Sequence, residues 1–189
     1  MKNFQHQPFK PHHPPHLVSE SGVYFITCRC RDRKWFLRPD KYKEILLNSI
    51  NLGTKKLNIQ LLAFAILPNH YHLLITLPEN QNLSNFIRFV NGRSARLLND
   101  EDSSIFQKIW NNYFDKGIRS EKDFYTHLNY IHQNPIKHGV VKSFAELLGY
   151  RFCSYAEWVE KKGKEVVEDS FARYPVIDFL HFVKDDPDF

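Results

Sequence analysis

The stretch Pro-Asn-His-Tyr-His-Leu-Leu-Ile, residues 68–75, contains two histidines that are separated by one residue within an apolar run. Successive side chains of a β-strand point to opposite faces of a sheet, so the sequence predicts that His70 and His72 share one face and that Tyr71 lies on the other. Two imidazoles on a buried strand face are costly unless something uses their nitrogens. Because imidazole is the commonest metal-ligating side chain, the pair indicates a divalent-cation site.

The segments around this strand alternate between strand and helix patterns. Runs of β-branched and aromatic residues predict strands, and apolar residues at helical spacing predict helices. The predicted strands are residues 22–28, 57–67, 70–77 and 105–118, and the predicted helices are residues 40–52, closed by Gly53, and 84–98. This order predicts an α+β fold with a ferredoxin-like βαββαβ core, in which helices cover one face of an antiparallel sheet.

The remaining segments lie at the two ends of the chain. Ser120 is a plausible N-cap for a third helix that meets Pro135, and a C-terminal tail of helix and loop follows. Residues 1–16 are rich in proline and histidine, which predicts a flexible arm. At 189 residues we expect one main domain, residues 17–158, followed by a tail over residues 159–189.

The charge balance is basic. Lys and Arg number 26 against 21 Asp and Glu, a formal net charge of +5. This balance suits an acidic partner such as nucleic acid, although an ordinary basic protein has it too. Six arginines are candidate phosphate contacts, with a solvated surface as the alternative. Three follow the first strand and three lie on the second helix: Arg29, Arg31, Arg33, Arg88, Arg93 and Arg96.

The three cysteines do not form a disulfide pattern, which fits a reducing compartment. The sequence has no apolar run of membrane-spanning length and no apolar signal-peptide core, so we expect a cytoplasmic protein without a membrane partner. Cys28 and Cys30, together with His70 and His72, leave open a structural zinc site. The spacing of the cysteines departs from the usual zinc pattern.

A second informative segment is Tyr-Ile-His-Gln-Asn-Pro, residues 130–135. Residues four apart on a helix share a face, so Tyr130 and Asn134 are predicted to project toward one point. A phenol can act as a nucleophile, and an amide oxygen is a suitable ligand for Mg²⁺ or Mn²⁺. Since Pro135 disfavours helical geometry at the residue before it, Gln133 is the alternative to Asn134 as the third ligand.

Together these segments resemble a known family. His70-Tyr71-His72 resembles the histidine–hydrophobic–histidine (HUH) motif of single-strand DNA nucleases. With residues 130–135 added, the chain is similar to single-tyrosine transposases and, more narrowly, to the REP-associated tyrosine transposases of bacteria. The resemblance spans residues 22–158 and includes Tyr24-Phe25-Ile26-Thr27, Ile118-Arg119-Ser120-Glu121-Lys122-Asp123, Lys137-His138-Gly139-Val140-Val141 and Ser154-Tyr155.

The resemblance implies an enzyme that cleaves and transfers single-stranded DNA near a hairpin. His70, His72 and Asn134 would bind Mg²⁺ or Mn²⁺. Tyr130 would attack the scissile phosphate, leaving a 5′-phosphotyrosine and a free 3′-OH. REP-associated members favour a monomer over a dimer, and DNA binding would place the protein on the nucleoid.

The sequence departs from the family pattern at two positions. Tyr71 is bulkier than the usual aliphatic middle residue, and Lys116 follows Asp115 where a histidine is common in relatives. Two alternatives remain open beside the transposase interpretation. One is a domesticated DNA-binding protein of the same fold that does not cleave, and the other is a regulator built around structural zinc.

Overall fold

The computed structural model describes residues 22–79, 81–102 and 108–176. The predicted arm over residues 1–16 lies outside these residues. The strands are β1 (Gly22–Cys30), β2 (Gln60–Ile66), β3 (His70–Leu77) and β4 (Trp110–Ile118). The helices are the short η1 (Arg31–Arg33), α1 (Asp40–Leu57), α2 (Leu83–Glu101), α3 (Glu121–Lys137), α4 (Phe144–Leu148), α5 (Tyr155–Lys162) and α6 (Lys164–Arg173).

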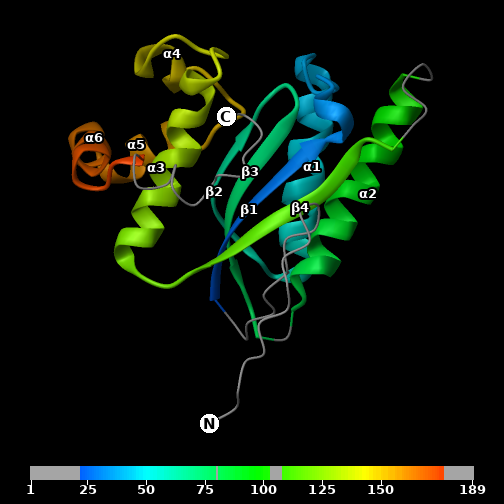
Figure 1. Ribbon diagram of the computed structural model, residues 1–189, viewed down its shortest axis with the longest axis horizontal. Coiled ribbons are helices and arrows are strands. Elements are labelled where there is room, and N and C mark those ends of the chain that lie inside the picture. Colours follow the sequence, from blue (N-terminus) through cyan, green and yellow to red (C-terminus); the bar gives the residue numbers. More distant parts are fainter. Residues whose placement is uncertain (1–21, 80, 103–107, 177–189) are drawn as a thin grey trace.

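The four strands form one sheet in the order β2-β3-β1-β4, and all neighbours are antiparallel (Figure 1). This is the strand order of the predicted ferredoxin-like core, which is therefore confirmed. The strand that carries the two histidines lies inside the sheet, between β2 and β1. Its register on β1 sets Arg29 opposite His70 and Thr27 opposite His72.

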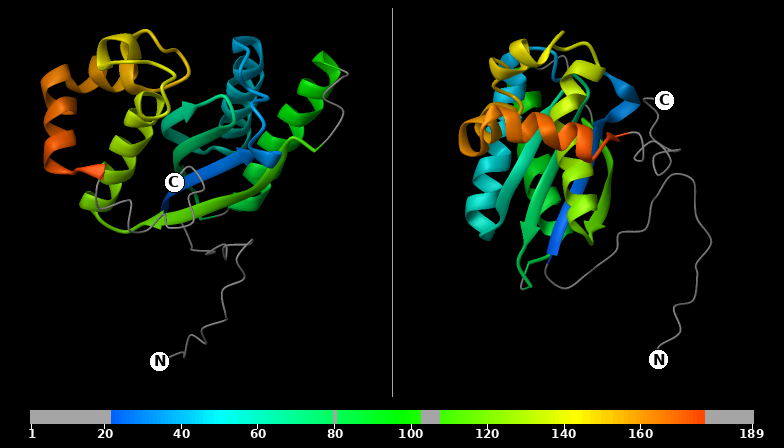
Figure 2. Two further views of the ribbon diagram at one scale, coloured as in Figure 1. Left: turned by 45° about the horizontal axis from the view of Figure 1, so that its top comes forward. Right: turned by 90° about the vertical axis from the view of Figure 1, so that its left-hand side faces the viewer.

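The sheet lies between two layers of helices (Figure 2), and a hydrophobic core fills each side. On one side, α1 and α2 pack on alternate residues of the strands, among them Ile26, Tyr71 and Leu73. The two core helices thus cover one face, as predicted. On the other side, α3 and the helices after it cover Phe25 and Leu74. Because strand side chains alternate between the two faces, the same strands supply both cores from alternate residues.

Helix α1 continues beyond the predicted stop at Gly53 and ends at Leu57, so that prediction was wrong. Gly53 lies where α1 meets α2. A Cβ atom at this position would lie 3.1 Å from Phe86 Cε2 and 3.1 Å from Phe89 Cδ1. The glycine therefore permits the close approach of two helices instead of ending one. Asn58 ends the helix in the left-handed conformation, with φ of 52°.

Helix α3 begins as the sequence predicts, because the Ser120 hydroxyl accepts a hydrogen bond from the Asp123 N–H at 3.1 Å. The helix continues through Pro135 to Lys137. The carboxylate of Asp123 also pairs with Lys116 Nζ at 2.8 Å, which ties the start of α3 to β4. Lys116, one of the two departures from the family pattern, therefore has a structural partner.

The C-terminal helices hold α3 from its outer side. Asn129 Nδ2 donates to the carbonyl oxygens of Ser170 and Tyr174, at 2.8 and 3.0 Å. The expected domain boundary at residue 158 falls inside α5. Residues of the expected tail up to 176 thus include helices that pack on the core, while residues 177–189 lie outside the described part of the chain.

We predict that Leu46→Ala destabilises the fold by about 2–5 kcal/mol, because the truncation leaves a cavity between α1 and the sheet. Leu46 is 0% exposed. The matched control is Leu52→Ala on the same helix, where the side chain is 42% exposed and the expected change is about 0.5 kcal/mol. Urea unfolding followed by circular dichroism measures both, and equal losses would contradict this account of the core.

A second prediction concerns the acid stability of the α3 layer. Burial lowers the pKa of His132 to about 3, whereas an unfolded chain has an ordinary histidine pKa of about 6.5. Between these two pH values the unfolded state binds a proton at His132 and the folded state does not. The free energy of unfolding therefore falls as the pH drops from about 6.5 toward 3. Burial also lowers the pKa of His127, to about 4, so both histidines contribute.

The measurement is the free energy of unfolding between pH 6 and pH 4. His132→Phe should make the decline shallower by about 1.4 kcal/mol per pH unit, the contribution of one proton. Leu46→Ala is the control, because it loses stability without losing a titratable group and should keep the wild-type slope. An unchanged slope in His132→Phe would show that His132 is protonated in the folded state.

Candidate active site

The two histidines of β3 lie side by side on the sheet face beneath α3, as the sequence predicts. Their ring centroids are 4.8 Å apart, and both side chains are buried. Tyr71 points to the other face, where its hydroxyl donates to Asn91 Oδ1 at 2.8 Å. The bulk of Tyr71 is therefore accommodated in the core beneath α2, away from the histidines.

Both imidazoles are oriented by a neighbour at Nδ1. His72 Nδ1 lies 2.8 Å from the Thr27 hydroxyl oxygen, and His70 Nδ1 lies 2.6 Å from Asn69 Oδ1. Thr27 reaches His72 because the two residues are register partners in the sheet. Contacts at Nδ1 fix the ring orientations, so other contacts of the two rings are made through their Nε2 atoms.

Helix α3 places Tyr130 and Asn134 against this pair. The Tyr130 ring centroid is 5.0 Å from that of His72, and Asn134 Oδ1 is 3.2 Å from His70 Nε2. Asn134 keeps helical geometry despite the proline after it. Gln133 is rotated by about 100° from Asn134 around the helix axis and is only half-buried. The structure thus brings Asn134 to the histidines as the candidate third ligand.

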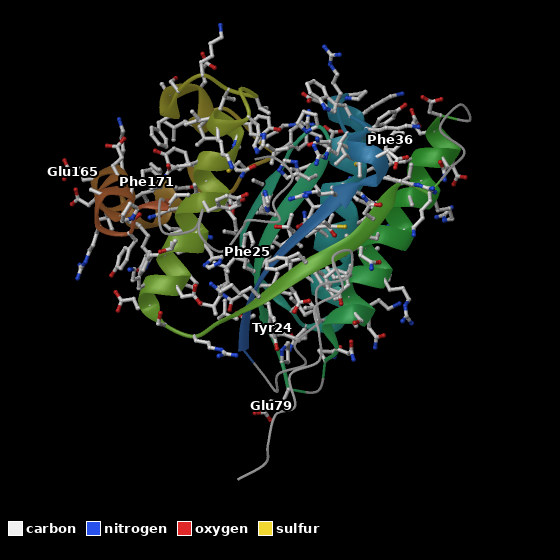
Figure 3. The ribbon with its side chains drawn as sticks, viewed as in Figure 1. Tyr24, Phe25, Phe36, Glu79, Glu165 and Phe171 are labelled. Carbon is white, nitrogen blue, oxygen red and sulfur yellow. The ribbon has the colours of Figure 1, made fainter. Side chains whose placement is uncertain are left out.

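The aromatic ring of Phe25 on β1 lies beneath the site. Its centroid is 5.6 Å from the His72 ring, in a stacked arrangement, and 5.8 Å from the Tyr130 ring. Figure 3 shows Phe25 between the sheet and α3. Phe25 therefore packs against both side chains and limits the rotamers available to each.

Two further residues at the end of α3 join the site. Lys137 Nζ lies 5.4 Å from the centroid of the Tyr130 ring, and the His138 ring centroid lies 5.0 Å from that of His70. Neither was a predicted site residue. Their spacing of seven and eight residues from Tyr130 places them on the same helical face, a signal that could have identified them.

The electrostatics of the site favour neutral imidazole at His72. Burial, followed by the positive charges of His70, Arg29 and other neighbours, holds the pKa of His72 well below its usual value. Its Nε2 atom is buried and has no hydrogen-bond partner among the described residues. A neutral ring with an available nitrogen lone pair is the form that binds a metal ion.

The donor set of the site is two imidazoles and an amide. Among the described residues, no group of three or more His, Cys, Asp or Glu side chains could hold a metal ion. A metal site at His70 and His72 would therefore need a ligand of another residue type, and Asn134 is the candidate that the structure places beside them. With few protein ligands, such a site would also use oxygens of the substrate or water, which suits a hard cation such as Mg²⁺ or Mn²⁺.

The cysteines do not belong to this site. Cys28 lies beside Tyr71 in the core on the opposite face of the sheet, where its sulfur accepts a hydrogen bond from Asn91 Nδ2 at 3.1 Å. Burial raises the pKa of Cys28 to about 12 and that of Cys30 still higher. Zinc binds the thiolate, which is disfavoured here. A shared zinc site of these cysteines with His70 and His72 is excluded by the opposite faces.

The six candidate arginines occupy different parts of the structure. Arg29 lies opposite His70 in the sheet, and its charge contributes to lowering the pKa of His72. Arg31 and Arg33 are exposed on η1, directly after β1. The other three lie on α2, which packs on the face opposite the histidines: Arg88, Arg93 and Arg96. Their role as phosphate contacts stays a prediction, and Arg29 alone of the six is placed at the histidines.

Within the described part of the chain, no helix is long and apolar enough to cross a membrane.

Comparison with curated proteins finds two similar chains. A protein of Haemophilus influenzae that carries the name of a REP-associated tyrosine transposase is 31% identical over 137 residues, covering 66% of this chain and 76% of that protein. The REP-associated tyrosine transposase of Escherichia coli is 28% identical over 129 residues, covering 67% and 74%.

The fold is similar to a solved structure described as a REP-associated tyrosine transposase bound to a REP hairpin. The TM-score is 0.66 at 25% identity, over 78% of this chain and 85% of that one. The sequence pattern of the family described as "Transposase IS200 like" matches residues 18–134, which is more than half of the chain and includes His70, His72, Tyr130 and Asn134. The chain belongs to the family of IS200-like transposases.

Proposed function

We propose that the protein is a metal-dependent endonuclease and strand transferase that acts on single-stranded DNA beside a hairpin, with Tyr130 as the nucleophile. The observation that carries this proposal is the meeting of a phenol, two oriented imidazoles and an amide oxygen in one buried site. The similar transposase with a solved structure is described as bound to a REP hairpin. A hairpin-bearing strand is accordingly the substrate that we propose for this chain.

In the proposed cleavage step, Tyr130 Oη bonds to the scissile phosphorus and the bond from phosphorus to the 3′ oxygen breaks. The phenol loses its proton, the departing 3′ oxygen gains one, and the downstream strand stays attached as a 5′-phosphotyrosine. The 3′-OH of the same or another strand can reverse the step by attacking the phosphotyrosine. Energy is conserved in the phosphodiester, so strand transfer needs no nucleotide cofactor.

The cationic residues around the phenol suit this chemistry. Lys137 Nζ lies 5.4 Å from the Tyr130 ring centroid, which places a positive charge beside the ring of the proposed nucleophile. Arg29 and His138 add positive potential where a phosphate would bind. A divalent cation held by His70, His72 and Asn134 would polarise a phosphate oxygen and stabilise the charge that develops on it.

The contacts of His70 are compatible with a bound cation. Its two ring nitrogens face the amide oxygens of Asn69, at 2.6 Å, and of Asn134, at 3.2 Å. A neutral imidazole carries one N–H and cannot donate to both oxygens. Three arrangements satisfy these contacts: a second proton on the ring, a cation held by His70 and Asn134, or a rotated Asn134 amide whose buried Nδ2 donates to Nε2.

One observation favours a second candidate function, DNA binding without cleavage on the same fold. The Tyr130 side chain is only 2% exposed. A phosphate can reach the phenol only if α3 or the side chains around it move. A protein that had lost cleavage would keep the fold and the basic surface, so the two functions are separated by the covalent intermediate.

We therefore predict that wild-type protein forms a covalent adduct with a single-stranded hairpin DNA in Mn²⁺, and that Tyr130→Phe does not. A label at the 3′ end of the DNA should stay on the protein in a denaturing gel, because the nucleophile keeps the downstream fragment. Tyr125→Phe is the matched control on the same helix, where the ring stacks on Tyr174 with centroids 5.0 Å apart. An adduct in Tyr130→Phe would assign the nucleophile elsewhere.

The metal assignment has its own prediction. Wild-type protein should bind one Mn²⁺ without DNA, and His72→Ala should weaken binding by more than about tenfold, because it removes the neutral imidazole with the available Nε2. His127→Ala is the control, since His127 is also buried beside Phe25 but faces Asp123. Isothermal titration calorimetry and Mn²⁺ electron paramagnetic resonance measure the affinity. Unchanged Mn²⁺ binding in His72→Ala would refute the site.

A further inference from the structure

The connection between β1 and α1 gathers positive charge around an exposed tryptophan. The side chain of Trp35 is 61% exposed, more than any other large apolar side chain in the described residues. Within four residues of Trp35 there is a single carboxylate, Asp32. The same range contains four exposed cations, which are Arg31, Arg33, Lys34 and Arg38. Exposure of a large aromatic ring to water is unfavourable, so an indole that stays outside the core is a candidate ligand-binding surface.

The connection is held against the turn between β2 and β3, directly before the strand that carries the histidines. The Cys30 N–H donates to the Asn69 carbonyl at 2.7 Å, and the Leu37 N–H donates to the Pro68 carbonyl at 2.8 Å. Leu37 is fully buried and anchors the end of the segment. Figure 3 shows Phe36, the neighbour of Trp35, at the end of the molecule opposite Glu79. The backbone on both sides of Trp35 is therefore anchored next to residues 68–70, while the indole stays exposed.

Two details concern this exposed position, a strained backbone before Trp35 and a cation beside its ring. Asp32 and Arg33 adopt left-handed backbone conformations, with φ of 56° and 54°. Such conformations cost roughly 1–2 kcal/mol for a residue with a Cβ atom and tend to persist at functional positions. The Arg38 guanidinium carbon lies 5.8 Å from the centroid of the Trp35 ring, a cation–π contact that supports the exposed ring.

We propose that Trp35 stacks on an unpaired nucleobase next to the hairpin, while the surrounding cations bind the flanking phosphates. This inference rests on the proposed function and adds a binding site for the strand outside the catalytic residues. Every nucleobase offers a flat π face, and phosphates lie on both sides of each base. An exposed indole surrounded by arginine and lysine therefore matches the repeating chemistry of single-stranded DNA.

The test compares two DNA molecules with the same stem, one with single-stranded extensions and one with blunt ends. Binding is measured in the Tyr130→Phe background, so that no covalent adduct forms. Trp35→Ala should weaken binding of the extended hairpin by about fivefold or more, the effect of one lost stacking contact, and leave the blunt hairpin unaffected. Trp35→Phe should retain part of the affinity, because it keeps an aromatic face.

Val166→Ala is the control for loss of an exposed apolar side chain, since Val166 is 59% exposed on α6 and should not affect either DNA. Equal losses on the two DNA molecules, or no loss on either, would overturn the inference. A loss confined to anionic phosphatidylserine vesicles would assign the connection to a membrane surface and overturn it as well.

The outcome is separable from that of the proposed cleavage. If protein with native Tyr130 forms the adduct while Trp35→Ala binds extended DNA normally, the stacking site alone is wrong. If no adduct forms but Trp35→Ala loses the extended hairpin selectively, the stacking site stands and the function reduces to DNA binding.

Discussion

The packing of α3 against the face of β3 that carries His70 and His72 is the contact on which the site depends. β3 lies between two strands of the sheet, and its successive side chains point in turn into the two cores. A shift of its pairing register by one residue would exchange the side chains that face each core. In the observed register Tyr71, Leu73 and Ile75 fill the core beneath α1 and α2. Because these side chains must be buried in that core, the histidines lie on the other face of the sheet, where α3 places Tyr130 and Asn134.

Burial gives the site its chemical character. His72 is desolvated and surrounded by positive charge, which keeps its ring neutral and its Nε2 available. Thr27 and Asn69 hold the rings without using their Nε2 atoms, and Phe25 packs against both the phenol and the His72 imidazole. The same burial shields Tyr130, so access of DNA to the phenol requires movement of α3 or of the side chains around the ring. The ties of that helix to β4 and α6, through Asp123 and Asn129, are the contacts that such a movement would strain.

The agreement between sequence and structure varies from element to element. The strand with the histidines, the start of α3 at Ser120 and the strand order were all predictable, because alternation, capping and element order are local or combinatorial features. Gly53 misled because a glycine that ends a helix and a glycine that lets two helices approach look alike in sequence. Pro135 raised doubt about Asn134, yet the surrounding packing keeps α3 helical through it.

The sequence by itself determined the pairing of His70 with His72, the shared helical face of Tyr130 and Asn134, and the membership of the chain in a transposase family. Only the tertiary structure decided that the cysteines face away from the histidines, that the arginines of α2 lie behind the sheet, and that Lys137 and His138 join the site. Periodicity along one element shows which residues share a face. It cannot show which faces of different elements meet, because that depends on how the helices pack on the two sides of the sheet.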